Sequence, residues 1–265
     1  MSLPLFKTTF KKNWVLGLIF TLVLMMYSGV MISMFDPASI DNLMKMFELF
    51  PPEIMSMLGF AEAFTDMTGY LASWLYGLLM IGFPMVYSIM LGNKLIAKTV
   101  DNGSIACLLS TPDSRVKIAL TKAIYAIISM IVILGIVFIF NITLSNAMFP
   151  GSLDIEAFTN LNITVLLVNI TVMAITFFCS CLFSDTKYSI GFGAGIPLAF
   201  LLIKMLSGVS DKLDFLTKIS IFGWYDPMKI ASGEIAMTAN IAYIVIAIVL
   251  FVAGIMIFKR KRLAV

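Results

Sequence analysis

The sequence predicts an all-α polytopic membrane protein with six transmembrane helices. Of its 265 residues, 60% are hydrophobic and 12% are charged, and the mean hydropathy is +1.02. A soluble globular domain is about half apolar and about a quarter charged, so this chain has too little charge to cover a water-facing surface. Because apolar stretches are spread from one end to the other, we expect residues 1–265 to form a single transmembrane domain.

Each expected helix is built on a stretch without Asp, Glu, Lys or Arg. Crossing the hydrocarbon core takes about 20 apolar residues. We place the spans at about 14–34, 70–91, 123–144, 161–183, 189–205 and 235–258. The fifth is the shortest, because its charge-free part is Ser189–Ile203, and it contains Pro197, which a membrane helix tolerates with a kink. The first has no small-residue cleavage site after it and is interpreted as a retained helix.

The distribution of Lys and Arg predicts the orientation. With the N-terminus inside, 13 of the 18 basic residues fall on the inner side, as do Asp101, Asp113 and Asp185 of the 15 acidic residues. The other five lysines, Lys45, Lys204, Lys212, Lys218 and Lys229, fall outside. We therefore expect a multi-pass protein of the plasma membrane with both termini in the cytoplasm.

Three segments outside the spans are expected to lie along the membrane. Leu3, Phe6, Phe10 and Trp14 recur at helical spacing beside three lysines, which predicts either an interfacial elbow helix or an extension of the first span. The long outer segment Phe35–Gly69 holds a short amphipathic pattern at Ile40, Leu43, Met44 and Phe47. In the other, Leu206–Glu234, the aromatic residues Phe222, Trp224 and Tyr225 precede Asp226-Pro227, and we expect a helical hairpin at the outer interface.

Several kinds of chemistry are excluded by what the sequence lacks. It has no histidine, which removes the commonest general base and metal ligand. Apart from Lys204 at the end of the fifth, the predicted spans hold no carboxylate or basic side chain of the kind that ion-coupled transporters need. No phosphate-binding loop is present. Cys179 and Cys181, with Cys107 elsewhere, form neither a convincing metal site nor a disulfide framework. Any energy source has to be a separate chain.

The inner connection Gly92–Lys122 is the most informative segment. Asp101 and Ser104 can cap a helix start, and Ile105, Leu108 and Leu109 would form one apolar face. Ser110-Thr111-Pro112 stops this helix and opens the next. Such a helix is either a docking element for a partner groove or a surface connector without a partner, and the physical argument favours neither.

This connection resembles the signature of the ATP-binding cassette (ABC) type-2 exporter permeases. That family has an acidic residue, Gly-Ser/Thr, an apolar run, Leu-Leu-Ser-Thr-Pro and Ser-Arg. The matching residues are Asp101, Gly103-Ser104, Ile105–Leu109, Leu108–Pro112 and Ser114-Arg115, with Asp101 where Glu is more usual. The basic ending Phe258–Leu263 and Tyr225-Asp226-Pro227 are similar to further family patterns.

The resemblance implies the membrane subunit of an ABC exporter, which is not itself an enzyme. Two copies, or this chain and a paralogue, would pair within the membrane lipid. ATPase subunits holding ATP and Mg²⁺ would dock from the cytoplasmic side. Asp101, Gly103, Ser104, Ile105, Leu108, Leu109, Thr111, Pro112 and Arg115 would form the coupling helix, with Asp185 in a second, smaller contact. The chain itself would need no cofactor, and nothing indicates nucleic acid.

Polar residues also recur inside two spans. Asn162, Asn169 and Thr176 are seven residues apart on one face of the fourth span, and Asn141 lies late in the third. Such a stripe either holds helices together, which we favour, or lines a substrate path. The apolar helices and the family's habit suggest an amphipathic or hydrophobic substrate, such as an antimicrobial peptide, a drug or a lipid-like molecule. The alternatives are a non-transport scaffold or assembly protein and an intramembrane enzyme with a cysteine nucleophile.

Overall fold

The computed structural model describes residues 1–36, 66–110, 113–207 and 215–261, and the regular elements among them are all helical. In order they are α1 (Leu3–Ser33), α4 (Met67–Leu71), the π-helix η2 (Ala72–Tyr76), α5 (Leu79–Leu95), α6 (Ala97–Asp101), α7 (Ile105–Leu109), α8 (Arg115–Met148), α9 (Ile155–Leu182), α10 (Thr186–Ser207), α11 (Phe215–Ile219), α12 (Pro227–Ala231) and α13 (Met237–Arg260). Six helical segments are long and apolar enough to cross a membrane, and each overlaps one predicted span. The prediction of an all-α chain with six candidate spans is confirmed.

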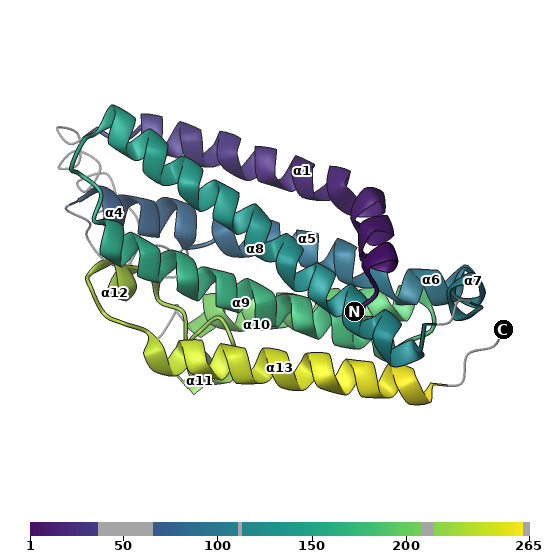
Figure 1. Ribbon diagram of the computed structural model, residues 1–265. Helices are drawn as coiled ribbons and strands as arrows, with labels where there is room; N and C mark the ends of the chain where they lie inside the picture. The colour runs from purple at the N-terminus through teal and green to yellow at the C-terminus, as the bar shows by residue number, and fades with distance from the viewer. Residues whose placement is uncertain (37–65, 111–112, 208–214, 262–265) are drawn as a thin grey trace.

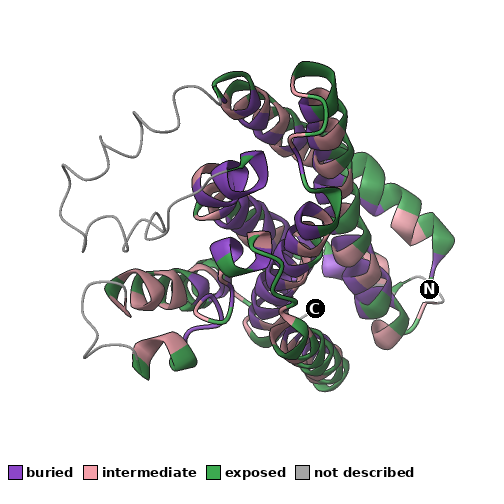
Figure 2. Ribbon diagram, turned by 90° about the vertical axis from the view of Figure 1, so that its left-hand side faces the viewer, coloured by how far each residue is buried: buried purple, intermediate pink, exposed green. Residues whose placement is uncertain are grey.

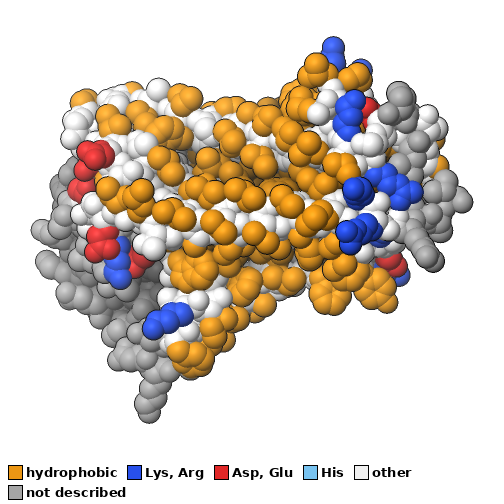
Figure 3. All heavy atoms as spheres, turned by 60° about the horizontal axis from the view of Figure 1, so that its bottom comes forward, with side chains coloured by type: hydrophobic (Ala, Val, Ile, Leu, Met, Phe, Trp, Pro, Cys, Tyr) orange, Lys and Arg blue, Asp and Glu red, His pale blue; other side chains and the backbone are white. Residues whose placement is uncertain are grey.

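The long helices lie side by side, with α1 beginning and α13 ending at the same end of the bundle (Figure 1). Most Lys and Arg side chains in Figure 3 gather at that end, most Asp and Glu at the other, and apolar side chains cover the band between them. We call the two ends the basic end and the opposite end. Large exposed side chains in the band include Leu22, Ile139, Leu202 and Val249. A soluble protein rarely exposes so broad an apolar surface, so the band faces lipid and the chain is a multi-pass membrane protein.

Helix α9 forms the centre of the bundle. In its most apolar stretch 72% of the residues are buried, against 22% for α1 and 17% for α10. It packs against α5, α8, α10 and α13, and Figure 2 shows buried residues toward the centre and exposed residues outside. A Cβ added at Gly92 of α5 would lie 2.5 Å from Thr176 Oγ1, and one at Gly254 of α13 would lie 3.4 Å from Phe178 Cα. Two neighbours therefore approach α9 closely through glycines.

The second predicted span is not one regular helix. It runs from α4 through the π-helix η2 and continues as α5 after a break at Gly77 and Leu78, and Pro84 lies inside α5. Backbone groups freed by such irregularities must find other partners in a lipid environment. The Tyr225 hydroxyl donates to the Tyr76 carbonyl oxygen at 3.1 Å, directly before the break. Tyr225, far along the chain, thus supplies a hydrogen bond to the backbone of this span.

The predicted elbow and the first span form one continuous helix, α1, whose first turns bend away from the rest (Figure 1). Thr8 Oγ1, Thr9 Oγ1 and Asn13 Nδ2 each donate to the carbonyl oxygen four residues earlier, at 2.8–2.9 Å. Side-chain bonds of this kind often bend helices. Leu3, Phe10 and Trp14 are exposed, and Phe6 packs against Tyr125. The interfacial position of these turns stays a prediction.

The two predicted outer segments are described in part. The amphipathic pattern within Phe35–Gly69 lies outside the described residues. Leu206–Glu234 contains the short helices α11 and α12, while its place at an outer interface stays a prediction. Of its three clustered aromatic residues, Phe222 and Tyr225 are buried, and Trp224 is exposed. Both belong to the core, and Tyr225 contacts the irregular second span through its hydrogen bond to Tyr76.

Candidate coupling loop and polar interior

The predicted coupling segment, Asp101–Arg115, lies at the basic end, where it begins at the last residue of α6 and contains α7. Gly103 connects them with a positive φ of 72°, a conformation that favours glycine. The expected capping is wrong. Asp101 is the last residue of α6, and the Ser104 side chain does not cap α7. Instead, Ser104 Oγ donates to Asn102 Oδ1 at 2.6 Å, because α7 begins from a tight turn rather than from an extended residue.

The apolar face of α7 packs against its own chain more than predicted. Ile105 is buried in the core, and Leu108 is half-buried against it. From Asp101 to Ser110 the exposed residues are Asp101, Asn102, Gly103, Ser104, Cys107 and Ser110. The side chain of Leu109, together with Thr111 and Pro112, lies outside the described residues. Any partner would therefore meet a mainly polar face along the described part of this segment.

Arg115 ties the loop to the last helix. It is the first residue of α8, and its Nη1 donates to the Lys261 carbonyl oxygen at 2.6 Å, where α13 ends. A cation is stabilised at this carboxyl-terminal end by the helix dipole. Asp113 forms an ion pair with Lys117 at 2.6 Å, and this hydrogen bond holds the pKa of Asp113 below its usual range. Arg115 thus has an intramolecular role that the sequence did not indicate.

Asp185, the expected second contact, lies in the turn between α9 and α10. Its Oδ1 accepts a hydrogen bond from the Lys187 backbone N–H at 2.7 Å, which stabilises the start of α10. Helix α6 contacts α10, so both predicted contact regions lie at the basic end. Asp185 is half-buried.

The polar residues near the opposite end interact with one another. Tyr76 of η2 donates through its hydroxyl to Asn162 Oδ1 at 2.7 Å, and Asn162 Nδ2 donates to the Phe158 carbonyl oxygen at 2.7 Å. Asn141 of α8 is fully buried and lies close to the Tyr76 hydroxyl. Neither of its amide atoms makes a hydrogen bond of normal geometry. The cluster joins η2, α8 and α9.

The other two residues of the stripe hold α9 against α5. Asn169 Nδ2 donates to the Met80 carbonyl oxygen at 2.9 Å. Pro84, four residues after Met80, has no N–H to donate to that oxygen, so Asn169 replaces the missing helical bond. Thr176 Oγ1 donates to the Ser88 carbonyl oxygen at 3.1 Å. This geometry favours the helix-joining interpretation of Asn169 and Thr176. Met80 and Pro84 were not identified from the sequence as part of this contact. A proline inside a predicted span leaves the carbonyl oxygen four residues earlier without its helical donor, and that spacing could have pointed to Met80.

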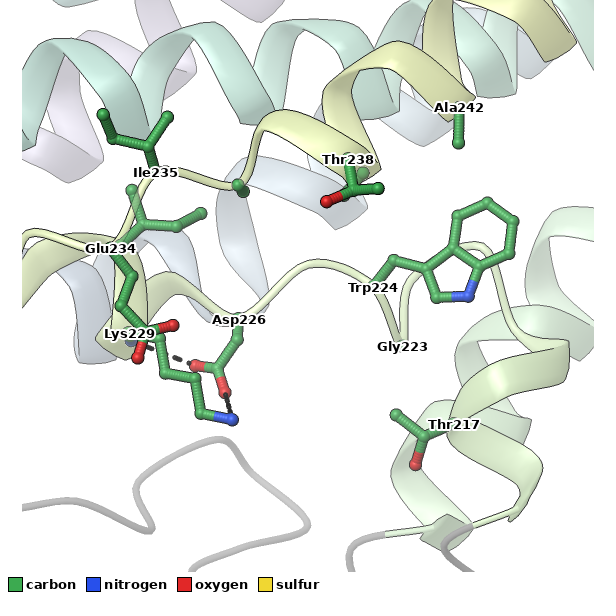
Figure 4. A pocket seen from close by; sticks show the side chains of 12 residues that line it. Thr217, Gly223, Trp224, Asp226, Lys229, Glu234, Ile235, Thr238 and Ala242 are labelled. Carbon is green, nitrogen blue, oxygen red and sulfur yellow. Dashed lines mark hydrogen bonds and ion pairs between the residues drawn. The ribbon is translucent and has the colours of Figure 1, made fainter.

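A cavity of about 630 Å³ lies at the opposite end, between α11, α12 and the start of α13 (Figure 4). Trp224, Asp226, Lys229 and Glu234 are among its lining residues. Asn141, Asn162, Asn169 and Thr176 do not line it. The predicted polar stripe is therefore separate from this cavity.

The Tyr225-Asp226-Pro227 motif has a structural basis. Asp226 Oδ1 accepts from the backbone N–H groups of Met228 and Lys229 at 3.2 and 3.3 Å, and Pro227 occupies the first turn of α12. This is the favoured start of a helix. Burial raises the pKa of Tyr225 well above its ordinary value, so its hydroxyl stays protonated and available to the Tyr76 carbonyl. The motif anchors α12 against the second span.

Among the described residues, no three Asp, Glu, Cys or His side chains cluster as metal ligands would. Cys107 is exposed, whereas Cys179 and Cys181 are buried, and none forms a disulfide. Burial lowers the pKa of Lys261, whose Nζ donates to the Cys181 carbonyl oxygen at 3.0 Å.

Comparison with known proteins decides the family. Residues 6–263 match the family described as ABC-2 family transporter protein. The chain belongs to this family. Nothing matched it among curated proteins or among solved structures. The family match confirms the resemblance to the ABC-2 permeases that was noted in the sequence. Members of the family are transport membrane subunits, and in general they associate with ABC ATPase partners.

Proposed function

We propose that this ABC-2 protein is the permease subunit of an ATP-driven exporter. Separate ATPase subunits would bind and hydrolyse ATP with Mg²⁺ in the cytoplasm, and two permeases, alike or paralogous, would form the pathway. The proposed cargo is an amphipathic or hydrophobic molecule, such as an antimicrobial peptide, a drug or a lipid-like compound. The observation that supports this most is the family match over residues 6–263 together with the signature loop at the basic end.

The orientation is part of the proposal. The basic end faces the cytoplasm, in agreement with the preference of Lys and Arg for that side. The plasma membrane then contains the apolar band, and both termini and the α6–α7 loop lie inside. An impermeant thiol reagent tests the orientation in sealed cells whose protein carries Ser39→Cys or Ala264→Cys. Labelling at Ser39 alone is expected, and equal labelling at both would overturn the orientation.

The coupling route follows from the connections of α6 and α7. Helix α5 leads into α6, and α7 is followed by α8, so a push on the loop acts on the second and third spans. Arg115 extends the contact to the end of α13. Closure of an ATPase pair against the exposed polar face would bias these helices between two arrangements.

Affinity purification from the native cell in mild detergent tests the function. An ABC ATPase and a second permease copy or paralogue should co-purify, and substrate should change the rate of ATP hydrolysis. A charge reversal at the exposed Asp101, Asp101→Lys, should reduce ATPase retention, while Glu156→Lys at the opposite end serves as the matched control. A complex that retains no ATPase would support the scaffold alternative instead.

A further inference from the structure

A cavity at the basic end is lined by three lysines from three helices. It has a volume of about 200 Å³ and lies between the first turns of α1, the end of α5, the α6–α7 loop and the start of α8. Lys12, Lys94 and Lys122 line it, and among the described residues its lining includes no Asp or Glu. Small-molecule pockets have volumes of roughly 300–1,000 Å³. The size therefore suits a compact anionic group better than a whole organic substrate.

Lys122 lines this cavity, and no carboxylate of the described residues forms an ion pair with it. It is 4% exposed, and its Nζ donates to the Leu95 carbonyl oxygen and, at 3.5 Å, to Thr99 Oγ1. Both partners are neutral. The two ion pairs among the described residues are Asp113–Lys117 and Asp226–Lys229, and Lys122 takes part in neither. A buried charge is costly unless it is paired, so an anion at this position would supply what the chain does not.

The remaining donors of the cavity favour the same ligand. Lys12 is exposed and Lys94 half-buried, and both add positive potential near Lys122. The lining hydroxyls are already used: Thr8 and Thr99 donate to carbonyl oxygens of their own helices, at 2.8 and 2.6 Å. The donors left for a ligand are the second N–H of the Asn13 amide and the ammonium groups, which bind phosphate as point charges.

The surroundings of the cavity indicate that the phosphate has an apolar tail. Phe10 and Trp14, on the same turns of α1 as Lys12, are exposed. Lys12 thus lies where the apolar band meets the basic end, at the level expected for lipid headgroups. We propose that the pocket formed by Lys12, Lys94 and Lys122 binds the phosphate of an anionic membrane phospholipid. This inference goes beyond the transport proposal and does not depend on it.

The site also touches the coupling loop. Ser104, Cys107 and Leu108 line the same cavity. A bound headgroup would therefore contact α1, α5, α8 and α7 together and support the position of the loop.

Native mass spectrometry of the full-length purified chain tests the proposal. The probes are phosphatidylglycerol, phosphatidylcholine and inorganic phosphate. Wild type is expected to retain phosphatidylglycerol best. Lys12→Gln with Lys94→Gln should weaken retention by about tenfold or more, since each lysine near an anionic surface contributes an affinity factor of several-fold. Lys7→Gln with Lys11→Gln removes the same charge from α1 outside the cavity, and it should leave retention nearly unchanged.

Three results would overturn the inference. Equal losses in the two double variants would show unspecific surface attraction. Binding of inorganic phosphate as tight as that of the lipid would assign the pocket to a free anion. Normal lipid retention with loss of the ATPase in Lys12→Gln/Lys94→Gln would assign it to a protein contact. Because Lys12 and Lys94 are not buried, these variants are expected to fold and leave the buried Lys122 unchanged.

Discussion

The interior of the bundle and its basic end both contain polar side chains, but these are satisfied in different ways. In the interior, Asn169 and Thr176 donate to carbonyl oxygens of the neighbouring helix α5. At the basic end, Lys122 has neutral partners and no carboxylate beside it. The first arrangement joins helices of one chain and serves packing, although Asn169 Oδ1 and the amide of Asn141 have no hydrogen-bond partner of normal geometry among the described residues. The second leaves a charge for something outside the chain, so it is the better guide to a binding site.

The largest effect on stability is expected in the interior, at the close contact between α5 and α9. Gly92→Ala should lower the free energy of unfolding by about 1–3 kcal/mol, because the added Cβ overpacks a tight contact. Gly82→Ala on the same helix meets nothing within 4 Å and is the matched control. Thermal unfolding in detergent measures both. Equal stability of the two variants would contradict the close approach.

Removal of the Asn169 amide should have a smaller effect. Asn169→Leu leaves the Met80 carbonyl without its donor, and we expect a loss of about 1 kcal/mol in the free energy of unfolding. In a Pro84→Ala background the residue at position 84 regains an N–H that can reach that carbonyl. The same substitution should then cost clearly less. A double-mutant cycle with no coupling would show that Asn169 does not replace the missing helical bond.

The smallest stability effect is expected at the basic end. Lys122→Met removes a buried charge along with its hydrogen bonds to neutral groups, and these two changes oppose each other. In lipid-free detergent the free energy of unfolding should change by less than about 1 kcal/mol, well below the effect of Gly92→Ala. Thermal unfolding with and without phosphatidylglycerol measures it, and the lipid should stabilise wild type more than the variant. A large loss without lipid would mean that Lys122 is satisfied by its own chain.

The sequence was informative where one property decides the structure. Charge-free length predicted the six spans, because a helix in lipid needs little else. The sequence did not show that the second span breaks at Gly77 and Leu78, since that break depends on Tyr225, about 150 residues later, for a hydrogen bond. Ile105 looked like part of a docking face because an apolar stripe does not specify whether its partner is another chain or its own core.

The lysines of the basic pocket were visible in the sequence, but their convergence was not. Lys12, Lys94 and Lys122 served as orientation markers, since each lies just beside an apolar stretch. That they meet at one cavity depends on the packing of α1, α5 and α8. Pairwise helix packing is set by side-chain shape along whole helices, which no local pattern in the chain expresses.

Contact between the α6–α7 loop and an ATPase is the central claim, and Cys107 offers a direct test. It is exposed in α7, whereas Cys179 and Cys181 are buried. A photo-crosslinker attached at Cys107 should join the chain to the ABC ATPase in the assembled complex, with a yield that changes on ATP addition. A Cys107→Ser chain with a cysteine at Thr143, an exposed position on α8, should give no such product. If Cys107 gives no more ATPase crosslink than position 143 in a complex that hydrolyses ATP, the loop is not the coupling element.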